Sequence, residues 1–101
     1  MFSGGTYDEV ARWLRNFLTA HAKRVDPRVE VVLEHGDERE GKSYGARLRF
    51  GQRLSPAIEF DFPGVAANRR SLAWCSDLAE RIRSLARDLV GDQEAADARR
   101  R

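Results

Sequence analysis

Three stretches of the chain alternate apolar and polar residues, at 28–35, 44–50 and 57–62. Alternation with a period of two is typical of β-strands that have one buried and one solvent-exposed face. The connections at 36–42 and 51–56 are too short for a helical crossover, so we predict an antiparallel three-stranded meander. Its apolar face carries Val29, Val31, Leu33, Tyr44, Ala46, Leu48, Phe50, Ile58 and Phe60.

The opposite face of this predicted sheet is charged. Arg47 and Arg49 lie on the middle strand, between two strands that carry acidic residues. Oppositely charged side chains on neighbouring strands attract each other. We therefore predict a paired, nearly neutral surface that is a poor platform for phosphate. Its carboxylates are Glu30, Glu34, Glu59 and Asp61.

An amphipathic helix is predicted before the strands. Thr6 and Glu9 have the spacing of a capping box, and Asp26 precedes Pro27, which disfavours the helical conformation at residue 26. The helix should therefore begin after Thr6 and end near Asp26. Its core-facing residues recur at spacings of three and four: Val10, Trp13, Leu14, Phe17, Leu18 and His21.

A second helix is predicted after the strands, from about Asn68 to Val90, with Gly91 as its C-terminal cap. Surface pairs are expected within it, Asp77 with Arg81 and Glu80 with Arg83. Residues 92–101 form a charged tail that is either flexible or an extension of the helix. The apolar stripe comprises Leu72, Cys75, Leu78, Ala79, Ile82, Leu85, Ala86 and Leu89.

Both helices must bury their apolar stripes on the apolar face of the sheet. The predicted fold is therefore α+β, a two-layer α-β-β-β-α sandwich with both helices on one face. We expect it to form one domain over residues 1–91, with no second domain.

The composition is that of an ordinary globular domain: 101 residues, of which 34% are charged and 42% hydrophobic. No apolar run is long enough for a membrane span, and the first residues lack the pattern of a secretory signal. Cys75 has no second cysteine with which to form an internal disulfide. We therefore expect a cytoplasmic protein.

Residues that could carry catalysis are scarce. His21 and His35 are expected to be packed or locally hydrogen-bonded histidines rather than catalytic or metal-binding groups. Cys75 is expected to be a small buried apolar residue rather than a nucleophile. No metal-binding spacing or glycine-rich phosphate loop is present, so we predict no enzyme activity and no cofactor.

Asn68-Arg69-Arg70 opens the second predicted helix. Cations in a first helical turn oppose the helix dipole, whereas a bound phosphate would be favoured there. Arg69 and Arg70 are therefore candidate phosphate contacts. The alternative is that the helix begins near Val65 or Ala66, which would make both arginines ordinary surface residues.

The order of elements, with Asn68-Arg69-Arg70-Ser71-Leu72-Ala73 opening the last helix, resembles the double-stranded-RNA-binding domain. In that family a lysine pair at this point spans the major-groove phosphates, and the first helix and first hairpin loop contact minor grooves. The resemblance implies that Arg69 and Arg70 replace the lysines. It also implies RNA contacts by Arg12 and Arg15 on the first helix.

Two departures from that family weaken the RNA interpretation. The first hairpin loop carries acidic residues where the family has a Gly-Pro-x-His sequence, and Ala73-Trp74 stands where the family has a further lysine. Like charge in the loop would repel phosphate. The acidic loop residues are Asp37, Glu38 and Glu40.

Trp74 and Leu78 widen the apolar stripe of the second helix, and the third strand is a short edge strand. Surplus apolar width and open edges are typical of protein-binding surfaces. Alternatively, Trp74 covers the core beside Phe17. Our interpretation is a non-enzymatic domain that binds protein, a second copy or another chain, through Trp74, Leu78 and the edge strand; double-stranded RNA is the less favoured partner.

Overall fold

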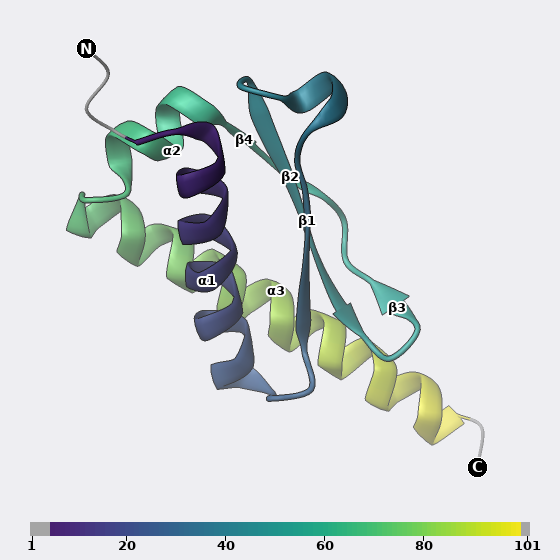
Figure 1. The fold of residues 1–101 in the computed structure, drawn as a ribbon. Coiled ribbons are helices and arrows are strands. Elements are labelled where there is room, and N and C mark those ends of the chain that lie inside the picture. The colour runs from purple at the N-terminus through teal and green to yellow at the C-terminus, as the bar shows by residue number, and fades with distance from the viewer. Residues whose placement is uncertain (1–4, 100–101) are drawn as a thin grey trace.

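β2 (Ser43–Phe50) is the central strand of an antiparallel sheet. It pairs with β1 (Glu30–Glu34) along one edge, and with β3 (Arg53–Leu54) and β4 (Ile58–Asp61) along the other. The structure, a computed structural model, describes residues 5–99, which form these four strands, three α-helices and a short 3₁₀ helix, η1 (Asp37–Arg39) (Figure 1). The predicted α+β class with an antiparallel meander is confirmed, except that the third strand is divided into β3 and β4.

The division between β3 and β4 is a β-bulge. Ser55 faces Leu48: its N–H donates to the Leu48 carbonyl at 2.8 Å, and its Oγ accepts from the Leu48 N–H at 2.8 Å. Two residues before Leu48 on β2, Ala46 faces Ile58. Pro56 and Ala57 of the third strand therefore lie opposite the single residue Arg47 of β2. The extra residue keeps Ile58 and the alternate residue Phe60 on the core face.

α1 (Tyr7–Val25) begins at the predicted capping box. Thr6 Oγ1 accepts from the Glu9 N–H at 3.2 Å, and the Glu9 carboxylate accepts from the Thr6 N–H at 3.4 Å. The helix ends at Asp26, whose carboxylate accepts from the Arg28 N–H at 2.9 Å. Both predicted ends of this helix are confirmed.

The predicted bounds of the second helix are wrong at both ends. Asp61 caps a separate helix, α2 (Phe62–Asn68), by accepting from the Gly64 N–H at 2.7 Å, and Pro63 lies in its first turn. A new helix, α3 (Leu72–Arg99), begins after Ser71, whose Oγ accepts from the Trp74 N–H at 3.3 Å. Asn68 therefore ends one helix and does not open the next.

α3 passes through Gly91 instead of stopping there. Gly91 does not have the positive φ that a glycine cap requires. The residues after Gly91 include alanine, glutamate and glutamine, which favour helix, so the helix continues to Arg99. Its last turns extend beyond β3 and away from the sheet (Figure 1).

α1 and α3 pack against each other and cover one face of the sheet, while α2 packs on the end of α1 and on β4 (Figure 1). The other face of the sheet is open. Tyr44, at the centre of the core, donates its hydroxyl to the Tyr7 carbonyl at 2.8 Å, and burial raises its pKa. The largest fully buried side chains are Tyr44, Leu14, Leu18, Leu48, Ile82, Val10, Val29 and Val65.

Candidate protein interface

β4 is an edge strand, and the outer backbone groups of Glu59 are unpaired within residues 5–99. The Phe62 N–H donates to the Lys42 carbonyl at 2.8 Å, which continues the ladder in which Phe60 faces Tyr44. Because the two kinds of residue pair alternate along an antiparallel ladder, the N–H and C=O of Glu59 point away from β2. Among residues 5–99, β4 pairs with β2 alone, so no other strand bonds to these two groups.

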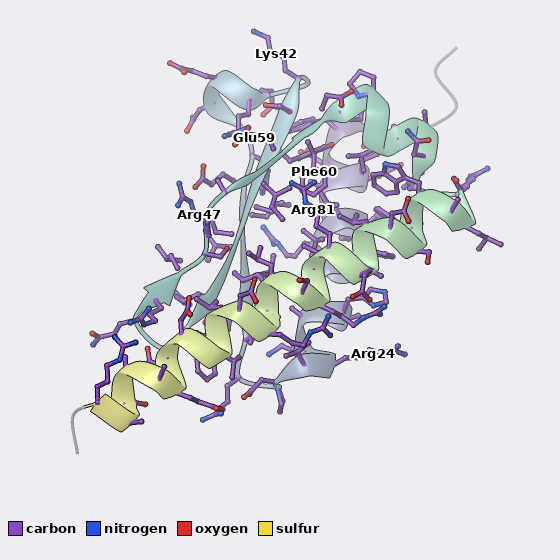
Figure 2. All side chains as sticks on the ribbon, turned by 180° about the vertical axis from the view of Figure 1, so that it is seen from behind. Arg24, Lys42, Arg47, Glu59, Phe60 and Arg81 are labelled. Carbon is purple, nitrogen blue, oxygen red and sulfur yellow. The ribbon has the colours of Figure 1, made fainter. Side chains whose placement is uncertain are left out.

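A groove runs between this edge and α3. Two adjoining hollows of about 320 and 310 Å³ border β4 and share Arg81 as a wall. Figure 2 shows Phe60 and Arg81 between the ribbon of α3 and the strands. We call this the β4–α3 groove; its helix wall comprises Trp74, Asp77, Leu78, Arg81, Ser84, Leu85 and Asp88.

Leu78 is mostly buried. Its relative exposure is 6%, because it packs into the core, and it also lines the first hollow of the groove. Its place in a protein interface stays a prediction. Leu85, seven residues further along α3, is half-buried and lines the second hollow.

Trp74 both covers the core and reaches the surface, the two alternatives predicted for it. It is half-buried and packs against Trp13 of α1, with ring centroids 6.2 Å apart, and Trp13 in turn stacks on Phe17 at 5.1 Å. It also lines the β4–α3 groove. Trp74 therefore holds α3 against α1 and leaves part of its side chain available to a partner.

The groove carries carboxylates without ion-pair partners. The predicted pair of Asp77 with Arg81 does not form, and neither Asp77 nor Asp88 is in an ion pair with any other of residues 5–99. The predicted pair of Glu80 with Arg83 does form, at 3.2 Å, on another side of the helix. The helix wall of the groove is therefore acidic on either side of one arginine.

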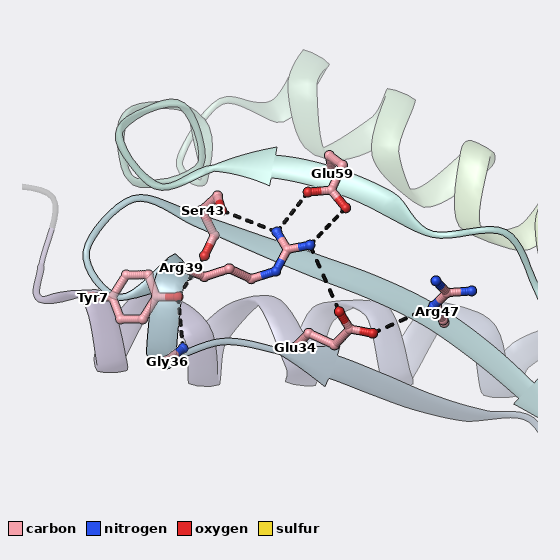
Figure 3. Close-up of polar contacts among 7 residues, drawn as sticks. All are labelled: Tyr7, Glu34, Gly36, Arg39, Ser43, Arg47 and Glu59. Carbon is pink, nitrogen blue, oxygen red and sulfur yellow. Dashed lines mark hydrogen bonds and ion pairs between the residues drawn. The ribbon is translucent and has the colours of Figure 1, made fainter.

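The predicted ion pairs on the open face of the sheet form between β1 and β2 but not between β2 and β4. Arg49 donates to Glu30 at 3.0 Å through Nε, and Arg47 Nε lies 3.6 Å from Glu34. Glu59 instead binds Arg39, whose Nη1 and Nη2 donate to its two carboxylate oxygens at 2.7 and 3.0 Å (Figure 3). Asp61, the fourth predicted carboxylate, caps α2 and takes no part in the ladder.

Arg39 is the residue that sequence reasoning missed. It comes from η1 in the first hairpin loop and reaches across β2, where it also approaches Glu34 Oε2 at 3.8 Å and donates to Ser43 Oγ at 3.1 Å (Figure 3). The hydrogen bonds from Arg39 to Glu59 hold the pKa of Glu59 below its ordinary value. A glycine in the middle of a strand, Gly45, was the available signal, because it leaves room for another group to approach.

The candidate RNA contacts are not arranged as predicted. Arg69 and Arg70 lie in the connection between α2 and α3, outside the first turn of either helix. Arg12 and Arg15 are exposed on α1, and Arg15 Nη2 lies 3.4 Å from His35 Nε2. The unfavourable dipole position that suggested a phosphate ligand is therefore absent.

The histidines and the cysteine have local structural contacts. His21 packs on Phe17 at 4.6 Å between ring centroids, and its Nδ1 lies 3.3 Å from Arg83 Nη1. Partial burial, helped by Arg83, lowers its pKa. Cys75 donates its thiol to the Arg69 carbonyl at 3.3 Å, and burial raises its pKa.

The part of the chain that the structure describes holds no cluster of three or more histidine, cysteine or acidic residues suited to a metal ion. None of its helices is both long and apolar enough to cross a membrane. Comparison with protein-family models, curated proteins and solved structures finds no match to this chain. No relative therefore bears on the resemblance to the double-stranded-RNA-binding domain.

Proposed function

We propose that this chain is a non-enzymatic protein-interaction domain that binds a partner along the edge of β4 and the facing side of α3. The observation that carries the proposal is the unpaired peptide group of Glu59 beside the β4–α3 groove. An extended segment can add to such an edge through main-chain hydrogen bonds, while alternate side chains enter the groove. The partly exposed Trp74 and Leu85 supply apolar area for those side chains.

Proline substitution at the edge tests this proposal. Glu59→Pro removes the outward N–H without removing a bond to β2, and proline is tolerated on edge strands. Glu59→Gln is the matched control, because it removes the same charge and keeps the N–H. Circular dichroism and thermal unfolding should show that both variants fold.

The binding assay has two parts. Sedimentation from micromolar to millimolar concentration measures self-association, and selection from a library of displayed extended peptides measures binding of other segments. We expect binders that lose affinity with Glu59→Pro and keep most of it with Glu59→Gln. A mass of one chain at every concentration, together with no selected peptide, would contradict the proposal.

Binding of double-stranded RNA is the competing proposal. It is supported by exposed arginines on α1 and in the α2–α3 connection, namely Arg12, Arg15 and Arg70. It is opposed by the acidic residues of η1, which would repel phosphate. Arg69 and Arg70 lie outside the first turn of either helix, so the helix dipole gives no argument for a phosphate bound between them. The edge of β4 therefore has the stronger support.

A further inference from the structure

We infer that the segment bound at β4 is basic: an extended stretch of another protein in which arginine or lysine alternates with apolar residues. This inference rests on the proposed function and specifies its partner. Three observations carry it: the charge on the open side of β4, the charge in the groove, and the result of pairing β4 with itself.

The open side of β4 presents the carboxylate of Glu59 to an added strand. The side chain of Glu59 is 62% exposed, whereas the carboxylate of Asp61, the alternate residue, caps α2. Arg39 approaches Glu59 from the opposite side, over β2, so the outer side of that carboxylate stays accessible. Opposite charges on neighbouring strands stabilise pairing, so this face favours cationic side chains.

The groove side of an added strand meets α3. Side chains that alternate with the cations would point toward this helix, where Trp74 and Leu85 are half-buried. Asp77 and Asp88 flank this apolar surface and have no ion-pair partner within residues 5–99. Apolar residues therefore suit the groove, and further cations would meet the carboxylates of Asp77 and Asp88 on either side of Arg81.

Self-pairing of β4 is disfavoured by the same charges. The outward-directed backbone groups within β4 belong to Glu59 and Asp61, so in an antiparallel pair of two copies Glu59 would lie opposite either Glu59 or Asp61 of the second copy. Like charges directly opposite each other destabilise a strand pair. A second copy is therefore a poorer occupant than a basic segment.

β2 already has the alternation of arginine and apolar residues that we infer for the bound segment. In β2, Arg47 and Arg49 alternate with Ala46, Leu48 and Phe50, and Arg49 lies opposite Glu30 of β1. A synthetic peptide with the sequence of residues 44–50 is therefore a suitable probe. The control is the same peptide with glutamate in place of both arginines.

Fluorescence anisotropy with both peptides at 50 and 150 mM salt is the test. We expect the arginine peptide to bind about tenfold more tightly than the glutamate peptide, with a smaller ratio at the higher salt. The double variant Asp77→Asn and Asp88→Asn should lower that ratio. The double variant Glu38→Gln and Glu40→Gln, an equal change of charge on the exposed first hairpin loop and outside the groove, should leave it unchanged.

The site is located with the Glu59 variants. Glu59→Pro should abolish binding of the arginine peptide, while Glu59→Gln should weaken it by a few-fold only. Amide hydrogen exchange should show new protection at Glu59 in the complex. Binding that survives Glu59→Pro would place the peptide at another surface, such as the edge of β1, and would overturn this inference.

Failure of the inference differs from failure of the proposed function. Equal affinity for the two peptides, both lost with Glu59→Pro, would retain the interaction surface and reject its preference for basic segments. A dimer that forms through β4 would likewise replace the basic segment with a second copy. No binding of either peptide, with a mass of one chain at all concentrations, would reject both.

Discussion

The guanidinium of Arg39 lies directly over Gly45. A Cβ atom at position 45 would stand 2.8 Å from Nη2 and 3.0 Å from Cζ of Arg39. The absence of a side chain at this point of β2 lets one arginine reach both Glu34 on β1 and Glu59 on β4. The first hairpin loop is thereby tied to the edge strand on the far side of the sheet.

We expect Gly45→Ala to raise the pKa of Glu59 toward its ordinary value. The new methyl group would displace the Arg39 guanidinium, whose hydrogen bonds hold that pKa low. NMR titration of the two carboxylates measures the effect, and Glu30, whose pKa is lowered by Arg49, is the internal control. An unchanged pKa at Glu59 would show that Arg39 keeps its position.

Ser55→Ala should destabilise the fold by about 1 to 3 kcal/mol, the cost of leaving a buried donor without an acceptor. Ser55 is 3% exposed, and its Oγ accepts from the Leu48 N–H inside the bulge. Chemical denaturation measures the loss. Ser76→Ala, at an exposed position of α3, should change the free energy of unfolding by less than about 0.5 kcal/mol. Equal effects would contradict a special role for Ser55.

Gly91→Ala should stabilise the protein by about 0.5 to 1 kcal/mol. Gly91 lies inside α3, and a Cβ there would meet no other atom within 4 Å. Alanine loses less conformational freedom than glycine on forming a helix. Thermal unfolding measures the gain. A destabilised variant would mean that α3 ends at Gly91, as its sequence first suggested.

His21 should make the free energy of unfolding decrease as the pH falls below about 6.5. Its pKa in the folded chain is lowered by partial burial and by Arg83 and Arg24, whereas the unfolded value is about 6.5. The unfolded state therefore binds more protons in this range. Stability is complete above 6.5 and decreases as the pH falls toward the folded pKa. His21→Gln should flatten this dependence; an unchanged slope would assign it to other groups.

Duplex RNA of about 16 base pairs should bind with a Kd no lower than about 10⁻⁶ M, the tight end of non-specific binding at physiological salt. Neither Arg69 nor Arg70 lies in the first turn of a helix, and η1 carries Asp37 and Glu38. Titration at physiological salt, repeated with the double variant Arg69→Glu and Arg70→Glu, measures this. Tight binding that is lost in the double variant would favour the RNA proposal.

Local patterns predicted the fold class well. The capping box of Thr6 and Glu9 and the alternation along β2 are set by near neighbours in the chain, so their signals are complete within a few residues. The bulge at Ser55 was not predicted, because it depends on a hydrogen bond to Leu48 seven residues away in the sequence. Arg39 was missed for the same reason, since its partners come from two other strands.

The second helix shows where apolar periodicity misleads. A stripe of apolar residues indicates which side of a helix is buried, but not where the helix begins. Asp61 and Ser71 are both good caps, and each starts a helix. The two residues of the predicted interface differ in exposure: Trp74 is half-buried and lines the groove, whereas Leu78 is 6% exposed and packs into the core.

Two side chains fix the two ends of β4, one in the bulge before it and one at its last residue. Ser55 anchors the approach to it through Leu48, and Asp61 anchors its exit by capping α2. A short edge held at both ends keeps one conformation before anything binds. The entropy lost on binding there would then come almost entirely from the incoming segment, so a rigid or cyclised segment would gain the most affinity.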